Sequence, residues 1–146
     1  MDIEIITSNF QLDIYGFGSI ATNKDYTGTA FKLSGKMWEI IKANGIKNKG
    51  MNVWVYETGD KVFAGVELEN DTGNSNNGLE KKQISMDKYA YCMHIGPYNL
   101  IKQAGQNMVN ELTKQGFEII PPYIEIYGHW TGDEATSETE LLMCLK

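Results

Sequence analysis

The two halves of the sequence align with each other without a gap, at a constant separation of 71 residues. The aligned pairs include Met37 with Met108, Ile41 with Leu112, Gly45 with Gly116 and Tyr56 with Tyr127. A helical pattern, the glycine that ends it and the strand that follows all stay in register, which is more than two amphipathic helices would share by chance. An internal repeat of this kind indicates one supersecondary unit used twice, each copy covering the apolar face of the other. We therefore expect an α+β fold with tandem strand-helix-strand-strand units over approximately residues 10–68 and 79–146.

The first unit contains segments with the hydrophobic period of a strand and of a helix. Apolar and polar residues alternate in its first segment, which predicts a strand, and Gly16 and Gly18 are expected to introduce a bend or bulge there. An apolar stripe with helical spacing follows, and Gly45 stands where a left-handed helix cap is needed. The expected elements are a strand over residues 10–20, a helix over about 28–44, and a hairpin with strands over 52–56 and 61–68.

The second unit repeats this order after a polar segment, residues 69–78, which nearly lacks apolar side chains and predicts a surface loop. The expected elements are strands over 79–85 and 88–95, a helix with Ile101, Ala104, Met108 and Leu112 on one face that ends near Gly116, and strands over 121–127 and 138–145. We expect the strands to form an antiparallel sheet with both helices packed on one face. Grooves between repeated units are favoured places for small ligands, so we expect a ligand groove between the repeats.

The composition excludes several classes of protein. A chain of 146 residues with 42% apolar residues fits one globular domain over residues 1–146. The net charge of -6 and the scattered positions of its 13 lysines and arginines argue against direct nucleic-acid binding. The N-terminus lacks the pattern of a signal peptide, and no stretch approaches the roughly 20 apolar residues of a membrane span. We therefore expect a cytoplasmic protein that does not contact a membrane.

No motif for a metal, a cofactor or a nucleophile stands out. Cys92 and Cys144 are far apart, and in a cytoplasmic chain we expect both to be reduced and buried. Cys92 and His94 provide only half of a metal site, and His94 is better explained by a backbone hydrogen bond at the turn that follows it. The GFGS segment at residues 16–19 is too short for a phosphate loop. We expect no metal ion and no cofactor.

The strand PPYIEIY, residues 121–127, carries the feature that points to a function. Side chains alternate along a strand, so Tyr123, Glu125 and Tyr127 share one face and the two isoleucines share the other. A carboxylate among aromatic rings is costly to desolvate unless a positive or hydrogen-bonding group meets it, and our hypothesis is that a ligand does so. In the alignment of the halves Trp54 takes the place of Glu125, so an indole and a carboxylate should face the same groove.

The second half resembles the GyrI-like small-molecule-binding domain, also described as the effector-binding domain of bacterial transcription activators. The similarity lies in YAYCMHIGPY, an amphipathic helix, PPYIEIY and the final ETELLMCL, and its specific positions are the turn at residues 96–98 together with Pro122, Glu125 and Tyr127. The resemblance covers nearly the whole chain. It implies the tandem fold, with an acidic residue after the second helix that meets cationic or amphiphilic compounds in an aromatic pocket. Glu125 matches that acidic position.

No helix-turn-helix segment or dimerising helix precedes the domain, so the chain resembles the free-standing form of the family. Such members include proteins similar to sequesterers of drugs or toxins, and a branch that hydrolyses reactive cyclopropane-bearing compounds with paired glutamates. Trp54 replaces the residue related to Glu125, so a second glutamate would have to come from elsewhere. Glu67 and Glu140 are the candidates.

We therefore expect a sensor or sequesterer that takes hydrophobic, cationic small molecules and recognises several drugs of that class. The expected ligand-binding residues are Glu125 as the counter-charge, Trp54 and Tyr127 as flat apolar walls, and Tyr123, Phe17 and Tyr91, with Trp130 as a weaker candidate. Binding is favoured over catalysis, but two alternatives stay open. One is a small hydrolase of electrophilic compounds that uses Glu125. The other is a protein-interaction or inhibitor module, with a topoisomerase or a separate DNA-binding regulator as its partner.

Overall fold

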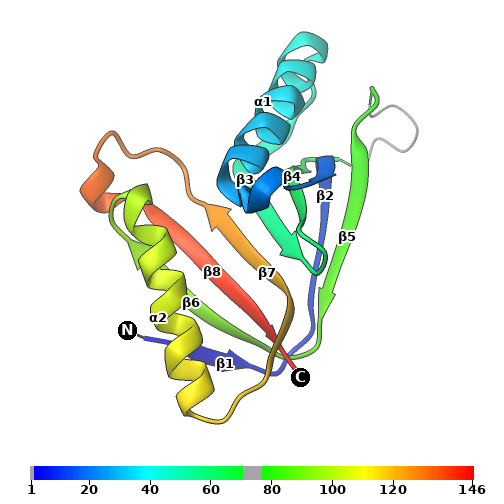
Figure 1. The fold of residues 1–146 in the computed structure, drawn as a ribbon. Coiled ribbons are helices and arrows are strands. Elements are labelled where there is room, and N and C mark those ends of the chain that lie inside the picture. The colour runs from blue at the N-terminus through cyan, green and yellow to red at the C-terminus, as the bar shows by residue number, and fades with distance from the viewer. Residues whose placement is uncertain (1, 71–76) are drawn as a thin grey trace.

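The structure, a computed structural model, describes residues 2–70 and 77–146 and confirms the predicted α+β fold (Figure 1). The strands are β1 (Glu4–Ile6), β2 (Phe10–Ile20), β3 (Asn48–Glu57), β4 (Lys61–Leu68), β5 (Glu80–Met86), β6 (Tyr89–Ile95), β7 (Ile119–Tyr127) and β8 (Glu138–Leu145). The helices are α1 (Tyr26–Asn44) and α2 (Ile101–Lys114), and short 3-10 turns lie at Thr22–Lys24, Tyr98–Leu100 and Glu134–Thr136. Each half of the chain thus contains the order strand, helix, strand, strand.

All strands of the described residues belong to one antiparallel sheet with the order β1-β6-β8-β7-β3-β4-β2-β5. β6, β8 and β7 of the second half lie on one side of the sheet and β3, β4 and β2 of the first half on the other, whereas the two edge strands are exchanged, with β1 beside β6 and β5 beside β2. The halves meet where β3 pairs with β7. In this pairing Trp54 lies directly opposite Glu125, and Tyr56 lies opposite Tyr123. The two aligned positions of the repeat are therefore cross-strand neighbours at the centre of the sheet.

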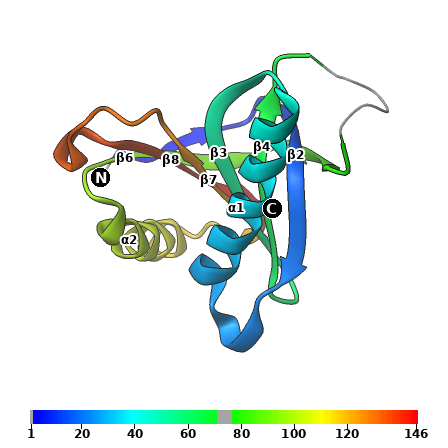
Figure 2. The same cartoon turned by 90° about the horizontal axis from the view of Figure 1, so that it is seen from above.

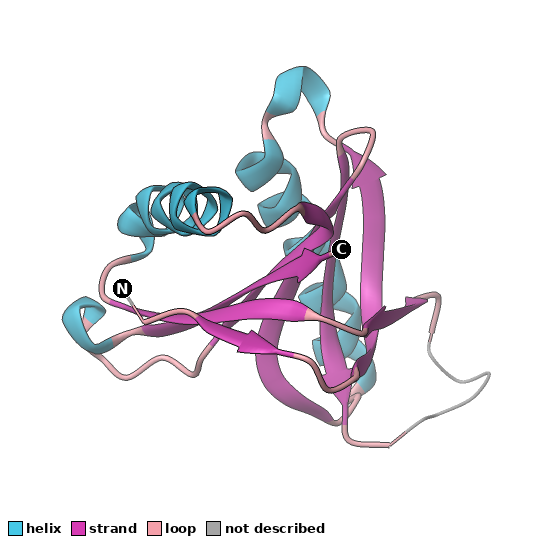
Figure 3. Cartoon of the chain, turned by 90° about the horizontal axis from the view of Figure 1, so that it is seen from below, coloured by secondary structure: helices cyan, strands magenta, loops and turns pink. Residues whose placement is uncertain are grey.

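The sheet is strongly bent, and a short connection requires the bend. Only Asp87 and Lys88 join β5 to β6, although β5 is one edge of the sheet and β6 lies next to the opposite edge. Two residues cannot span a flat sheet of this width, because strands lie about 4.8 Å apart. The strands therefore curve toward each other, as Figure 3 shows.

The face on the inside of this bend forms a core without any helix. Its buried residues come from seven strands and are Ile14, Val53, Val55, Phe63, Ile84, Met86, Tyr89, Ile124, Ile126, Leu142 and Cys144. The rings of Phe10 and Tyr89 meet edge to face at 5.5 Å and join the two ends of the sheet. The bend therefore buries the isoleucines of β7, and the alternation of the strand turns Glu125 to the other face.

Both helices lie on that other face, over different halves of the sheet (Figure 2). The buried residues of α2, Ile101, Met108 and Leu112, pack against apolar side chains of β6 and β8. Those of α1, including Met37 and Ile41, pack against β2 and β4. Because each helix has its own cluster, neither helix covers the central strands completely.

The helix ends follow the sequence signals closely. Asp25 caps α1, because its Oδ1 accepts a hydrogen bond from the Gly28 N–H at 3.1 Å, and this cap starts the helix two residues before the predicted start. Gly45 ends it with φ of 59°, as predicted. Gly116, with φ of 87°, follows α2 in the same left-handed region.

Three sequence expectations need correction or limits. The strand β1 was not predicted, and β3 begins at Asn48 rather than at residue 52, with a register shift between these positions. The bend or bulge expected at Gly16 and Gly18 is absent, since β2 pairs with β4 through both glycines without a shift. Of the predicted loop over residues 69–78, residues 71–76 lie outside the described residues.

The cysteines are free and buried on opposite faces of the sheet, Cys92 under α2 and Cys144 inside the bend. Within the described part of the chain, neither helix has the length and apolar character needed to cross a membrane.

Gly16 allows a close approach of β2 to β4, which yields a prediction. A Cβ at this position would overlap the backbone carbonyl of Ala64 and lie 2.7 Å from the Cα of Gly65, and rotation of a side chain cannot relieve either contact. We expect Gly16→Ala to lower the free energy of unfolding by about 2 kcal/mol or more, as measured by urea denaturation.

Gly35 provides the matched control, because a Cβ there meets no atom within 4 Å and the residue lies inside α1. We expect Gly35→Ala to leave the stability unchanged or raise it by up to about 1 kcal/mol, since alanine favours the helix. Equal stability of Gly16→Ala and the wild type would contradict this account of the close strand approach.

Candidate functional site

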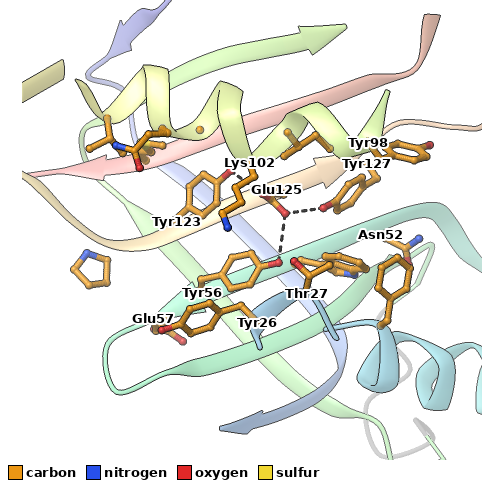
Figure 4. Close-up of a pocket in the computed structure, with 18 of the residues that line it drawn as sticks. Tyr26, Thr27, Asn52, Tyr56, Glu57, Tyr98, Lys102, Tyr123, Glu125 and Tyr127 are labelled. Carbon is orange, nitrogen blue, oxygen red and sulfur yellow. Dashed lines mark hydrogen bonds between the residues drawn. The ribbon is translucent and has the colours of Figure 1, made fainter. Parts of the chain in front are cut away.

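A cleft of about 1290 Å³ opens on the helix face of the sheet, over the pairing of β3 with β7. Its walls come from the two central strands, from the start of α1 and the segment before it, from α2, and from the residues that follow β7. Figure 4 shows the central residues of this cleft as sticks. The separation of the two helices leaves this strip of the sheet accessible.

Glu125 lies at the centre of the cleft and is held by three phenols (Figure 4). The hydroxyl of Tyr127 donates to its Oε1 at 2.6 Å and the hydroxyl of Tyr123 donates to its Oε2 at 2.7 Å. The hydroxyl of Tyr56 also donates to Oε1, at the longer distance of 3.4 Å. The residue is only 8% exposed, so these hydrogen bonds replace most of the water that a carboxylate would otherwise bind.

Strand pairing explains why these side chains meet. Tyr123, Glu125 and Tyr127 alternate along β7, and the antiparallel register places Tyr56 and Trp54 of β3 beside them. The rings of Tyr56 and Tyr123 stack at 5.7 Å between centroids, and the rings of Trp54 and Tyr127 meet edge to face at 4.8 Å. Four aromatic rings thus surround the carboxylate, and we call these four residues with Glu125 the tyrosine cage.

Glu125 has no counter-ion in the part of the chain that the structure describes. Among residues 2–70 and 77–146, no lysine or histidine forms an ion pair with it. Lys102 of α2 extends into the cleft near the cage (Figure 4), but no ion pair joins it to Glu125. Among the described residues, four carboxylates and two lysines line the cleft, and one of the carboxylates, Glu57, pairs with Lys82 at 2.6 Å, so a small excess of negative charge remains along the lining.

The three phenols remain protonated in this environment. Burial raises the pKa of Tyr56, Tyr123 and Tyr127 far above the ordinary value, and the charge of Glu125 and the hydrogen bond to it raise the pKa further. Each hydroxyl therefore keeps its proton and acts as a donor toward the carboxylate. The cage carries one negative charge spread over a network of short hydrogen bonds.

One end of the cleft is lined by exposed aromatic rings. Phe31 of α1 is 63% exposed and Trp130 after β7 is 60% exposed, which is unusual for residues of this size. The ring of Phe31 packs on Trp54 at 5.0 Å, and Tyr98 packs between Tyr127 and Trp130. These rings extend the apolar surface of the cage out to the solvent.

The structure brings together some of the predicted site residues and excludes others. Glu125, Trp54, Tyr127, Tyr123 and Trp130 all line the cleft, whereas Phe17 and Tyr91 do not. Phe17 is buried on β2 beneath α1, with the Lys36 amine 4.0 Å from its ring centroid.

Tyr91 lies on the opposite face, because its place in β6 directs it into the bend, where its hydroxyl donates to Glu140 at 2.8 Å. Strand alternation alone could not establish which face of β2 or β6 shares the cleft.

The two candidates for a second glutamate also lie elsewhere. Glu67 forms a surface ion pair with Lys49 at 2.7 Å, and Glu140 accepts the hydrogen bond from Tyr91 away from the cleft. The predicted backbone contact of His94 is present, since its Nε2 lies 3.2 Å from the Pro97 carbonyl oxygen. No group of three or more His, Cys, Asp or Glu residues suited to a metal ion occurs in the described ranges.

Sequence reasoning missed Tyr56 as a member of the site. Its hydroxyl reaches Glu125 from the other half of the molecule. The alignment of the halves contains the signal, because Tyr56 aligns with Tyr127 and the pair flanks the two aligned positions Trp54 and Glu125. Phe31 and Lys102 carry no comparable signal, since only the packing of the helices on the sheet brings them to the cleft.

The phenols of the cage predict a loss of stability at alkaline pH. Their pKa is higher in the folded protein than the ordinary value of about 10, so above about pH 10 the unfolded chain releases protons that the folded protein retains. Stability from these groups is fully present below that pH and declines above it. We expect the free energy of unfolding in urea to fall steadily from about pH 10 to about pH 11.

Burial, the largest cause of the raised pKa, remains in Glu125→Gln, so the decline over this pH range should persist in that variant. A constant free energy of unfolding across this pH range would contradict the assignment.

Solved structures share this fold at low sequence identity. SAV2435 bound to tetraphenylphosphonium superposes with a TM-score of 0.72 at 13% identity, over 100% of this chain and 94% of that chain. The C-terminal domain of EcmrR gives 0.73 at 17% identity, over 100% and 99% of the two chains. A hydrolase from Listeria innocua gives 0.58 at 9% identity, over 99% and 91%. Because the identities are this low, the superpositions establish a common fold and no more.

The sequence finds no match among the curated proteins. The family model of the GyrI-like small molecule binding domain, however, matches residues 32–146, which is most of the chain and includes the whole of β7 and α2. The chain therefore belongs to the family of GyrI-like small-molecule-binding domains.

Proposed function

We propose that the protein binds hydrophobic cations in the cleft, with Glu125 as the counter-charge and the tyrosine cage as the walls. A single observation carries this proposal: a carboxylate that is 8% exposed lies within a ring-lined cleft without any ion-pair partner among the described residues. A buried charge without a partner is costly, and a cation that enters the cleft supplies the partner.

The chemistry of the walls favours a lipophilic cation over a hydrated one. Cations are attracted to the faces of aromatic rings by about 0.5 to 2 kcal/mol per contact, and the attraction is strongest where water is excluded. Apolar groups on the ligand gain further from burial against the exposed rings of Phe31, Tyr98 and Trp130. A small hydrated ion such as Na⁺ would gain neither the attraction to the ring faces nor the burial of apolar groups.

The size of the cleft suits bulky ligands of varied shape. Its volume of about 1290 Å³ is larger than most drug-sized ligands require, because pockets for such ligands usually measure about 300–1,000 Å³. Rings on several sides accept flat groups in more than one orientation. Recognition of several compounds of one charge class is therefore part of the proposal.

The comparisons support this proposal by analogy of fold. SAV2435 holds tetraphenylphosphonium, a bulky lipophilic cation. EcmrR is a DNA-binding protein in a transcription complex, and its C-terminal domain has the same fold. We therefore propose a sensor or sequesterer of such compounds in the cytoplasm, which as a sensor would act with a DNA-binding regulator.

Hydrolysis at the same glutamate is less well supported. A general base needs a lone pair free to accept a proton from water, whereas three phenols already donate to Glu125. Neither Glu67 nor Glu140 lines the cleft. Each of the other three carboxylates that line it already has a partner: Lys82 for Glu57, Tyr26 for Asp60 and the Gly28 N–H for Asp25. The contacts of Glu125 favour electrostatic stabilisation of a bound cation over proton abstraction.

Tetraphenylphosphonium tests the proposal through the melting temperature. At a concentration about 100 times its dissociation constant, it should raise the melting temperature of the wild type by about 5 to 10 °C. In Glu125→Gln the amide keeps the shape and an acceptor oxygen for the phenols but removes the charge, so the shift should fall by at least half.

Glu140→Gln is the matched control, because Glu140 also accepts a tyrosine hydrogen bond but lies outside the cleft. It should show the shift of the wild type. Equal shifts for the wild type and Glu125→Gln would contradict the role of Glu125 as the counter-charge. The absence of any shift with tetraphenylphosphonium and similar cations would refute the proposed function.

A further inference from the structure

We propose that the cleft selects onium ions, which are permanently charged cations without N–H groups, over protonated amines, because the phenols of the cage occupy the hydrogen-bonding capacity of Glu125. This inference rests on the proposed function and specifies its ligand class. It assigns to the three tyrosines the role of specificity determinants, in addition to their role as walls.

The hydrogen bonds on Glu125 leave little room for another donor. A carboxylate offers about four lone-pair sites on its two oxygens. Tyr127 and Tyr56 both donate to Oε1, and Tyr123 donates to Oε2. At most one site on Oε2 is left, and the residue is only 8% exposed.

Two other acceptors that line the cleft, Asn52 and Asp60, already accept hydrogen bonds within the protein. The side-chain oxygen of Asn52 accepts from the indole N–H of Trp38 at 2.7 Å and from the Ser34 hydroxyl at 3.2 Å. Asp60, at the mouth of the cleft, accepts from the hydroxyl of Tyr26 at 2.6 Å. The phenols of the cage cannot become strong acceptors by losing their protons, because burial raises their pKa.

A protonated primary amine brings three N–H donors, all of them bonded to water in solution. In the cage, one donor at most can reach a free carboxylate site, so the others exchange water for the oxygens of neutral phenols, which are weaker acceptors. Displacing a phenol from Glu125 would only move the loss to the phenol. The amine therefore loses part of the binding free energy that it gains from the charge of Glu125.

An onium ion avoids this loss. A quaternary ammonium or phosphonium centre has no donors to satisfy, and its surface of C–H groups matches ring faces. The faces available are those of Tyr56, Tyr123, Tyr127 and Trp54, which enclose the charge of Glu125. In this arrangement the negative charge attracts the ligand through space, without a direct hydrogen bond.

Two ligands with the same aromatic group separate the effect of the N–H donors from the effect of the positive charge. Naphthylmethyltrimethylammonium and naphthylmethylammonium both carry one positive charge at neutral pH, and only the second has N–H donors. By isothermal titration calorimetry, the wild type should bind the trimethylammonium compound at least about tenfold more tightly.

In Tyr127→Phe, the ring stays and one site on Oε1 becomes free, so the preference should fall to about threefold or less. Tyr123→Phe, which frees a site on Oε2, serves the same purpose if Tyr127→Phe does not fold.

Tyr91→Phe is the matched control, since it removes a phenol that donates to a different carboxylate, Glu140, outside the cleft. Its preference should equal that of the wild type. Because every variant is compared with the same two ligands, the greater hydrophobicity of the methylated ligand contributes equally to each preference. Equal binding of both ligands by the wild type, or an unchanged preference in both cage variants, would overturn this inference while the proposed function stands. Failure of both ligands and of tetraphenylphosphonium to bind would refute both.

Discussion

The pairing of β3 with β7 is the constraint on which the rest of the site depends. It joins the two halves of the sheet and places Trp54 opposite Glu125 and Tyr56 opposite Tyr123. Because side chains on one face of an antiparallel pair lie within about 5.5 Å of each other, this register alone brings three rings and a carboxylate together. A shift by one residue would turn Glu125 into the apolar core inside the bend, away from the phenols of the cage.

The bend of the sheet gives this pairing its environment. The two-residue connection between β5 and β6 curves the strands, so the inner face buries Ile124 and Ile126 without a helix. Both helices are then free to pack on the outer face, each over one half, and the strip between them becomes the cleft. The cleft is therefore a consequence of how two similar units share one sheet, and its central carboxylate, Glu125, stands at the position that Trp54 occupies in the other unit.

The tyrosine cage resolves a physical conflict. A buried carboxylate needs donors to compensate for lost water, yet a lysine partner within the protein would neutralise the attraction for a cationic ligand. Phenols supply donors without positive charge, so Glu125 remains stable in the free protein and still negative. In the proposed function, the same hydroxyls would restrict which cations gain from the site, which would link the stability of the free protein to the choice of ligand.

Periodicity and the repeat were sufficient to predict the α+β fold, both helices with their glycine ends, and the face shared by Tyr123, Glu125 and Tyr127, because these features depend on neighbours within one element. They could not place Phe17 and Tyr91, since alternation says that a strand has two faces but not which face meets the cleft. They also missed β1, and the bulge predicted at Gly16 is absent, because a strand approach that only glycine allows leaves the same sequence signal as a bend. Tertiary structure decided that Tyr56 and Lys102 reach the cleft and that Glu67 and Glu140 do not, because contacts between residues of distant elements arise only when the sheet bends and the helices pack on it.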